Sequence, residues 1–426
     1  MQVREISDSE KRHPVALGPY RVLDLTEYGC MIGPRILADL GADVIKIEPP
    51  GGSRSRIGPY YKDCVDGKKS LFWFAYCANK RGITLNLETT DGLSLFKRLV
   101  KTADVVIESF APGYLSGLGL GYEDLVKVKP DIIVASISPF GQTGPKAHYH
   151  SCDLTAWASG GILYICGDAD RPPLWIGFPQ AGLFGGMDAA NAAIGAIYYR
   201  GLTGEGQYID VSLQECAISP TLRTTVMWAL NRYEHTRSSL ALVEPTTNVR
   251  FRLSLRCCDG YIVIYMLGST APFTNSMDNL IAWMDEEGMA PDWLKNINWT
   301  TDYDATKISQ EFIDRVENAI EPFIITKTKN ELYEESIKRR ILIAPIQTTR
   351  EIAEDPQLKY RDFWLEIEHP ELQDTLTYVG PSIRLTETPV RFRRCAPLIG
   401  EHNQEIYTEL GLSKDELIAL REREVI

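Results

Sequence analysis

Short apolar runs alternate with amphipathic segments through the first third of the chain. Residues 21–26 (RVLDLT) have the period-two alternation of a strand, and 33–41 (GPRILADLG) have helical spacing and end on a glycine. Residues 43–50 (DVIKIEPP) are a second apolar run, which two prolines stop. A strand, a helix and a strand in close succession predict a βαβ unit and hence a parallel sheet. The alternation then repeats in segments expected to be helix, strand, helix and strand: 92–103, 104–109, 122–130 and 131–138.

A glycine-rich stretch precedes the longest apolar helix that the pattern predicts. Residues 173–186 (PLWIGFPQAGLFGG) are typical of a loop, and they lead into the helix over 187–207. Glycines at the entry to a buried helix allow backbone or a ligand to approach closely. No side chain in this stretch is an evident nucleophile.

The pattern changes between residues 224 and 340. Residues 250–266 (RFRLSLRCCDGYIVIYM) predict a hairpin that turns at Asp259-Gly260, and acidic segments with helical spacing follow. Short strands and a final helix over 415–423 complete the chain. We expect an α/β fold with three parts: a large Rossmann-like domain that begins with 1–223, a small α+β domain over 224–340, and a C-terminal segment, 341–426, that returns to the large domain.

Composition and charge limit the kinds of ligand and partner that the chain is expected to bind. The 426 residues are too many for one ordinary core, and the net charge of −12 argues against nucleic acid or an anionic membrane. The charged N-terminus and the lack of a long apolar run predict a cytoplasmic protein without a membrane span. Nine cysteines without a C-x-x-C pair, and no histidine at metal-ligand spacing, predict reduced thiols and no metal site.

Several stretches together resemble the family III CoA-transferases. They occur in the order that this family has, at 37–52, 77–92, 105–125, 136–145, 201–213, 259–264 and 368–412. The resemblance implies a large domain made from both ends of the chain, a small domain in the middle, and two chains interlocked like rings. It also implies coenzyme A, as an acyl thioester, and a carboxylic acid as the substrates.

Matching positions imply where coenzyme A would bind. Lys80 and Arg81 bring two cations to a loop before the apolar run 83–87, where they could meet a phosphate, although a solvated basic turn is the alternative. Phe110 matches an aromatic residue near the adenine, and Phe140 one near the thiol end. The predicted cofactor contacts are Asn79, Lys80, Arg81, Ser109, Phe110 and Phe140.

The chain departs from the family at the nucleophile. Family members attack the acyl-CoA thioester with an Asp, usually within V-P-x-G-D-L-x-x-G. Residues 178–186 here read FPQAGLFGG, so Gly182 stands at the position of that Asp and no catalytic residue is expected in this chain. The entry to the first helix, 27–34 (EYGCMIGP), also differs from the family pattern, as does Gly117, which replaces a basic residue. Asp153 matches one half of a racemase His-Asp pair, but an N-cap role explains it as well.

The missing Asp leaves three interpretations. The chain resembles the Asp-lacking member of a heteromeric enzyme, in which a paralogous subunit would supply the nucleophile. Succinyl-CoA would then be a candidate donor, and an aromatic dicarboxylate such as benzylsuccinate a candidate acceptor. The alternatives are a non-catalytic acyl-CoA-binding or regulatory homodimer, and an acyl-CoA racemase or isomerase.

Overall fold

The structure is a computed structural model that describes residues 15–63, 69–244, 247–304 and 306–426. By its internal contacts the chain divides into two compact units. Unit 1 runs up to Ile162 and takes in Ile176–Leu222 and Gln357–Ile426, whereas unit 2 comprises Leu163–Trp175 and Arg223–Pro356. Whether the chain folds as the predicted domains, with boundaries after residues 223 and 340, stays a prediction.

Six parallel strands form the sheet of unit 1, in the order β3-β2-β1-β4-β5-β6. The first three strands run outward from β1 to β3, and the chain then returns to the other side of β1 with β4, so the strand order reverses between β1 and β4. This arrangement confirms the predicted Rossmann-like α/β fold. The strands are β1 (Arg21–Leu25), β2 (Asp43–Glu48), β3 (Arg81–Thr84), β4 (Val105–Glu108), β5 (Ile133–Ser138) and β6 (Tyr208–Ser212).

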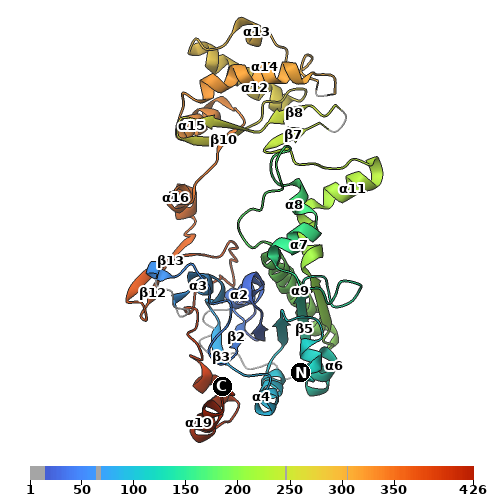
Figure 1. Ribbon diagram of the computed structural model, residues 1–426. Helices are drawn as coiled ribbons and strands as arrows, with labels where there is room; N and C mark the ends of the chain where they lie inside the picture. Colours follow the sequence, from blue (N-terminus) through green and yellow to red (C-terminus); the bar gives the residue numbers. More distant parts are fainter. Residues whose placement is uncertain (1–14, 64–68, 245–246, 305) are drawn as a thin grey trace. The chain divides into compact units, whose positions relative to one another are not determined.

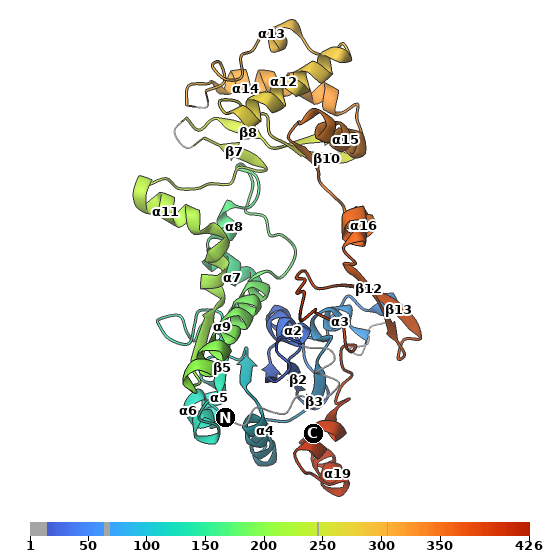
Figure 2. The ribbon, with the colours of Figure 1, turned by 180° about the vertical axis from the view of Figure 1, so that it is seen from behind.

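Helices cover both faces of this sheet. Val22 and Val105 face one cluster with α2 (Ile32–Asp39), α9 (Ala181–Thr203) and α10 (Leu213–Ile218). Leu23 and Val106, one residue further on each strand, face the opposite cluster. That cluster includes α4 (Thr90–Thr102), α6 (Tyr122–Val128), α18 (Asn403–Glu409) and α19 (Lys414–Glu422). Burial on both faces explains why apolar residues occupy consecutive positions, as at Val22-Leu23 and Val105-Val106. Figures 1 and 2 show α9, the long green helix, lying beside β5.

The long helix α9 begins earlier than the sequence predicts. The glycine-rich stretch was expected to remain a loop through Gly186, but the helix starts at Ala181. Tertiary packing explains the difference, because Gly182 and Gly186 face the backbone of a neighbouring helical segment at distances that a larger side chain would not allow.

The C-terminal part of the chain completes unit 1. The hairpin of β12 (Trp364–His369) and β13 (Asp374–Val379) packs against α3 (Leu71–Cys77) through a cluster that includes Phe74 and Tyr378. Further short helices are η1 (Tyr28–Met31), η2 (Tyr61–Asp63), α5 (Tyr114–Gly117), α7 (Asp153–Ser159), η4 (Ser219–Thr221) and α17 (Pro356–Tyr360). Two more helices, α8 (Ile162–Ile165) and α11 (Leu222–Asn231), contain residues of both units, as α17 does.

Unit 2 has a three-stranded antiparallel sheet, β11-β10-β9, and a two-stranded one, β7-β8, together with several helices. Gly260 of β10 pairs with Cys257 of β9, which confirms the predicted hairpin at Asp259-Gly260. Its strands are β7 (Ala241–Val243), β8 (Arg250–Arg252), β9 (Ser254–Cys257), β10 (Gly260–Ile264) and β11 (Ile343–Pro345). Its helices are α12 (Ala271–Glu286), α13 (Asp292–Lys295), α14 (Gln310–Ile324), α15 (Lys329–Arg339) and α16 (Thr349–Glu354). Within the described part of the chain, no helix is both long and apolar enough to span a membrane.

Candidate functional site

The reversal of strand order places the carboxyl ends of β1 and β4 next to each other. Open parallel sheets bind their ligands outside the strand ends at such a point. The loops that follow these strands, 26–31 and 109–113, are called the switch-point loops below. They are joined directly, because the backbone N–H of Glu27 donates to Oγ of Ser109 at 2.9 Å. We take these loops, with the segments that pack on them, as the candidate site.

Two buried lysines hold the ends of the first switch-point loop. Lys46 Nζ donates to the carbonyl oxygen of Thr26, and Lys80 Nζ donates to that of Met31 at 3.0 Å. Both ammonium groups pair with Asp24, at 3.6 Å and 2.8 Å, and all three side chains are fully buried. Burial alone would raise the pKa of Asp24, but the two cations more than offset it and hold the pKa below its usual value. The charged triad therefore fixes the loop to the sheet.

The predicted phosphate contacts at the start of β3 bind groups of the protein itself. Lys80 belongs to the triad with Asp24, and Arg81 forms ion pairs with Asp43, Glu405 and Glu409 at 2.6–2.7 Å. The Asn79 amide donates to Asp39 at 2.6 Å and to the carbonyl of Arg391 at 3.0 Å. All three are buried, so the alternative of a solvated turn is wrong. A phosphate would have to displace carboxylates that are already bound, and a role in binding coenzyme A stays a prediction.

The other predicted contacts lie at the opposite ends of their strands. Ser109 and Phe110 follow β4, and Phe140 follows β5, so these three lie at the carboxyl edge of the sheet. Phe110 is half-buried, with its ring centroid 4.7 Å from that of Tyr114. Phe140 stands edge-on to Tyr149 at 6.4 Å. The structure thus divides the predicted set into two groups of three residues.

Gly182, at the predicted nucleophile position, faces the backbone of η1. A Cβ atom built on Gly182 would lie 3.1 Å from Cα of Gly29 and 3.4 Å from N of Cys30. The contact continues one helical turn on, where a Cβ atom on Gly33 would lie only 2.3 Å from the carbonyl oxygen of Gly186. These four residues, Gly29, Gly33, Gly182 and Gly186, are called the glycine contact below. A side chain at 182 would have to enter space that the backbone of η1 already borders.

Asp153 binds the amino end of α9. Its carboxylate accepts hydrogen bonds from the backbone N–H groups of Gln180 at 3.0 Å and of Gly182 at 3.2 Å. The sequence suggested an N-cap role; in the structure Asp153 is the first residue of α7, and its side chain binds the start of α9. A carboxylate is favourable there because it meets the positive end of the helix dipole.

Cys30, beside the glycine contact, does not replace the missing carboxylate. Burial raises the pKa of Cys30 to about 12, and the charges of Asp153, Asp24 and Glu108 add to that effect. A thiol with this pKa is protonated at neutral pH and is a poor nucleophile. Among the described residues, no group of three His, Cys, Asp or Glu side chains is arranged to hold a metal ion.

Glu108 ends β4 as a buried carboxyl group. Burial raises its pKa from 4.5 to about 7, against hydrogen bonds from Ser136 and from the backbone N–H of Phe110. Because the raised pKa belongs to the folded state, the folded protein binds a proton that the unfolded chain has lost between these two values. The free energy of unfolding should therefore fall as the pH rises from about 4.5 to 7.

We expect Glu108→Gln to remove this part of the pH dependence. Urea unfolding of the wild type and the variant at several pH values would show it as a flatter profile for the variant. Glu123→Gln, at an exposed position of α6, is the control and should keep the wild-type slope. Equal slopes for the wild type and Glu108→Gln would contradict the prediction.

Comparisons with known proteins identify the family of this chain. The model of CoA-transferase family III matches residues 17–403. The chain belongs to this family. The succinyl-CoA:(R)-benzylsuccinate CoA-transferase subunit BbsE of Thauera aromatica is 32% identical over 405 residues, which cover 92% of this chain and 93% of that subunit. A succinyl-CoA:mesaconate CoA-transferase of Haloarcula marismortui is 32% identical over 406 residues, with 93% and 97% covered.

A solved structure supports the same assignment. The crystal structure of a CAIB/BAIF family protein from Brucella suis has a TM-score of 0.78 to this chain at 28% identity, with 92% of this chain and 98% of that one covered. The resemblance to family III found in the sequence is therefore confirmed. The family model and the relatives, which are named as CoA-transferases, identify this chain as a CoA-transferase. The substrates of such enzymes are CoA thioesters.

Two residues of the candidate site in this family III chain were not predicted from the sequence. Tyr28 has a left-handed backbone, with φ of 50°, and Glu27 accepts hydrogen bonds from two serines. The only signal in the sequence was that 27–34 departs from the family pattern. The left-handed backbone of Tyr28 could not be predicted, because residue types alone do not determine the backbone conformation of a loop.

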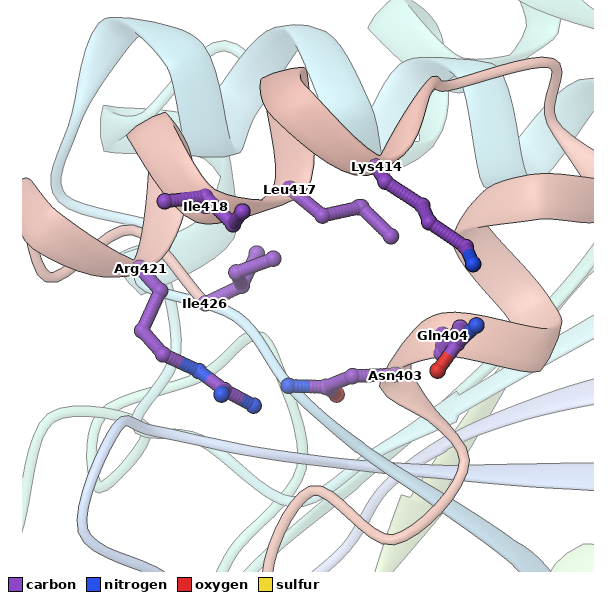
Figure 3. A pocket seen from close by; sticks show the side chains of 7 residues that line it. All are labelled: Asn403, Gln404, Lys414, Leu417, Ile418, Arg421 and Ile426. Carbon is purple, nitrogen blue, oxygen red and sulfur yellow. The ribbon is translucent and has the colours of Figure 1, made fainter.

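A cavity of about 280 Å³ lies between α18 and α19, away from the candidate residues in sequence. In Figure 3, Lys414 and Arg421 reach from α19 toward Gln404 and Asn403 on the other side. Leu417, Ile418 and Ile426 complete the lining. The cavity shares no residue with the switch-point loops or with the predicted contacts, so it is not part of the candidate site.

Proposed function

We propose that this chain is the subunit of a heteromeric family III CoA-transferase that does not carry the nucleophile. The observation that carries the proposal is Gly182, which occupies the predicted position of the Asp and whose Cβ direction meets the backbone of Gly29. The stretch around it belongs to the part of the chain that matches the family, residues 17–403, and Asp153 binds the start of α9 there. A related subunit would then supply the carboxylate that forms the anhydride and the enzyme-bound CoA thioester.

The relatives support a donor and a class of acceptor. BbsE acts with succinyl-CoA and (R)-benzylsuccinate by its name, and further relatives are named for succinyl-CoA with mesaconate or D-citramalate. We propose succinyl-CoA as the donor here and a carboxylic acid as the acceptor, with an aromatic dicarboxylate such as benzylsuccinate as the first candidate. Coenzyme A would approach the carboxyl edge of the sheet, where Ser109, Phe110 and Phe140 lie.

Exposed apolar side chains support an assembly of two interlocked chains. On α9, Tyr198 is 72% and Leu202 is 70% exposed, and on α11 Leu230 is 77% exposed. Apolar surface gathered on helices in this way usually meets a partner. We propose that the partner is a paralogous chain with the Asp.

Co-expression with an Asp-bearing paralogue tests the proposal. The two chains should co-purify, and only the mixed assembly should transfer CoA from succinyl-CoA to benzylsuccinate. A homodimer that binds succinyl-CoA without transfer in any mixture would favour the regulatory alternative and overturn the proposal. Incorporation of deuterium at the α-carbon of an acyl-CoA by this chain alone would favour a racemase or isomerase instead.

Gly182→Asp should not restore transfer by this chain alone. The new carboxylate would crowd Gly29 and face the charge of Asp153, which already accepts the N–H of residue 182. We expect a rate at least about 10³-fold below that of the mixed assembly, as for enzymes without their nucleophile. Gly182→Ala, which adds the Cβ without the charge, is the matched control for folding. A hydroxylamine-sensitive acyl adduct on the introduced Asp would refute this expectation.

A further inference from the structure

Tyr28 has a backbone conformation that its side chain disfavours. Its φ is 50°, in the left-handed region, and its side chain is 49% exposed. A bulky residue in this region is strained and persists only where its surroundings hold it in place. Such residues cluster at functional sites, so the strained backbone of Tyr28 indicates a candidate functional position.

Three serines hold the two residues Glu27 and Tyr28. The Glu27 carboxylate accepts hydrogen bonds from Ser53, at 2.6 Å, and from Ser55. Ser55 Oγ also accepts the backbone N–H of Tyr28 at 2.7 Å, and Ser109 Oγ accepts that of Glu27 at 2.9 Å. We call Ser53, Ser55 and Ser109 the serine clamp. Together with Lys46 and Lys80 at the loop ends, it fixes the backbone on both sides of an exposed aromatic ring.

The clamp places Tyr28 next to the predicted nucleophile position. Gly29, the following residue, is the one whose Cα would lie 3.1 Å from a Cβ atom on Gly182. The ring is thus attached one residue from the contact with Gly182, at the carboxyl end of β1, where ligands of open parallel sheets bind. A phenol offers a flat apolar face and a hydroxyl that donates to a carboxylate.

We propose that Tyr28 is a specificity-determining residue that contacts the carboxylic acid acceptor. The inference rests on the proposed function, because it names the group that recognises the acid at that same site. The face of the ring suits an aromatic or branched acid, and the hydroxyl suits its carboxylate. The serine clamp acts through Tyr28 and is a positioning device.

Kinetics of the mixed assembly test the proposal. The variants are Tyr28→Gly, which removes the ring and relieves the strain, and Tyr28→Phe, which keeps the ring without the hydroxyl. Gln373→Gly is the matched control, because Gln373 is also left-handed, with φ of 53°, but lies in the turn between β12 and β13. The KM for benzylsuccinate and the KM for succinyl-CoA are measured separately, with mesaconate as a second acceptor.

We expect Tyr28→Gly to raise the KM for benzylsuccinate by about 10-fold or more, the factor for one lost aromatic contact with its hydrogen bond. The KM for succinyl-CoA should stay within a factor of about two, and Tyr28→Phe should fall between Tyr28→Gly and the wild type. Gln373→Gly should leave both constants unchanged. A rise in the KM for succinyl-CoA alone would place Tyr28 at coenzyme A and overturn the proposal, as would no change in either constant.

Binding of benzylsuccinate by calorimetry separates this inference from the proposed function. If no assembly transfers CoA, the proposed function fails, but weaker binding by Tyr28→Gly than by the wild type would still support an acid site at Tyr28. No binding by the wild type, or equal binding by both, would overturn the inference. Ser55→Ala should also weaken binding, and it should add nothing to Tyr28→Gly, because the clamp acts through that ring.

Discussion

Asp24→Ala should lower the free energy of unfolding by about 3–5 kcal/mol, the cost of removing one partner from a buried ion pair. The substitution leaves Lys46 and Lys80 fully buried without their shared counter-charge. Urea unfolding at neutral pH measures the effect. The control is Asp124→Ala, which removes an exposed pair with Lys127 at 3.1 Å and should cost less than about 1 kcal/mol.

The pH dependence gives an independent check on Asp24. Its pKa in the folded state lies below the usual 3.8, so its contribution to stability is present above that value and is lost as the pH falls through the folded-state pKa. The Asp24→Ala variant should lack this acid-dependent loss. A cost near that of Asp124→Ala, with an unchanged acid profile, would mean that water or other groups neutralise the two lysines.

Gly33→Ala should destabilise the protein, whereas Gly195→Ala should stabilise it. A Cβ atom on Gly33 would lie 2.3 Å from the carbonyl oxygen of Gly186, so α2 and α9 would have to separate, at a cost of about 1–3 kcal/mol or more. Gly195 lies in α9 with nothing within 4 Å of its Cβ position, and alanine there should gain about 0.5–1 kcal/mol. Thermal unfolding measures both effects: the Tm should fall for Gly33→Ala and rise for Gly195→Ala.

The opposite signs make this pair a sharp test of the glycine contact. Both substitutions add one methyl group to a helix, and they differ only in what that group meets. Stabilisation by both would mean that the two helices can move apart at little cost, and that the position of Gly182 is less constrained than the geometry indicates.

The sheet was predictable because its strands are buried on both faces. Runs such as 105–107 and 133–135 are apolar throughout, and the helices between the strands have their own period, so the βαβ order follows from the sequence. The start of α9 could not be predicted from the sequence, because three glycines in its first two turns lower the helical propensity. Gly182 and Gly186 are favoured there by the close approach of η1 and α2, and Gly185 by that of the Leu213 side chain, so the cause is tertiary packing.

The candidate site was predictable in part, for a related reason. The absence of a nucleophile at Gly182 follows from residue type alone, because glycine has no side chain to react. The burial of Asn79, Lys80 and Arg81 did not follow, because a sequence does not show that Asp24, Asp43 and Asp39 come to meet these polar groups. The strain at Tyr28 was equally hidden, since it depends on hydrogen bonds to serines from distant segments.

The glycine contact also bears on how such a subunit could change over time. Gly29 and Gly182 each occupy the room that a side chain on the other would need. A mutation that returned an aspartate to 182 would place a Cβ atom 3.1 Å from Cα of Gly29, so η1 would have to move away slightly to make room for it. In a heteromeric enzyme, a return to one self-sufficient chain would then require an adjustment of η1 as well as the new carboxylate.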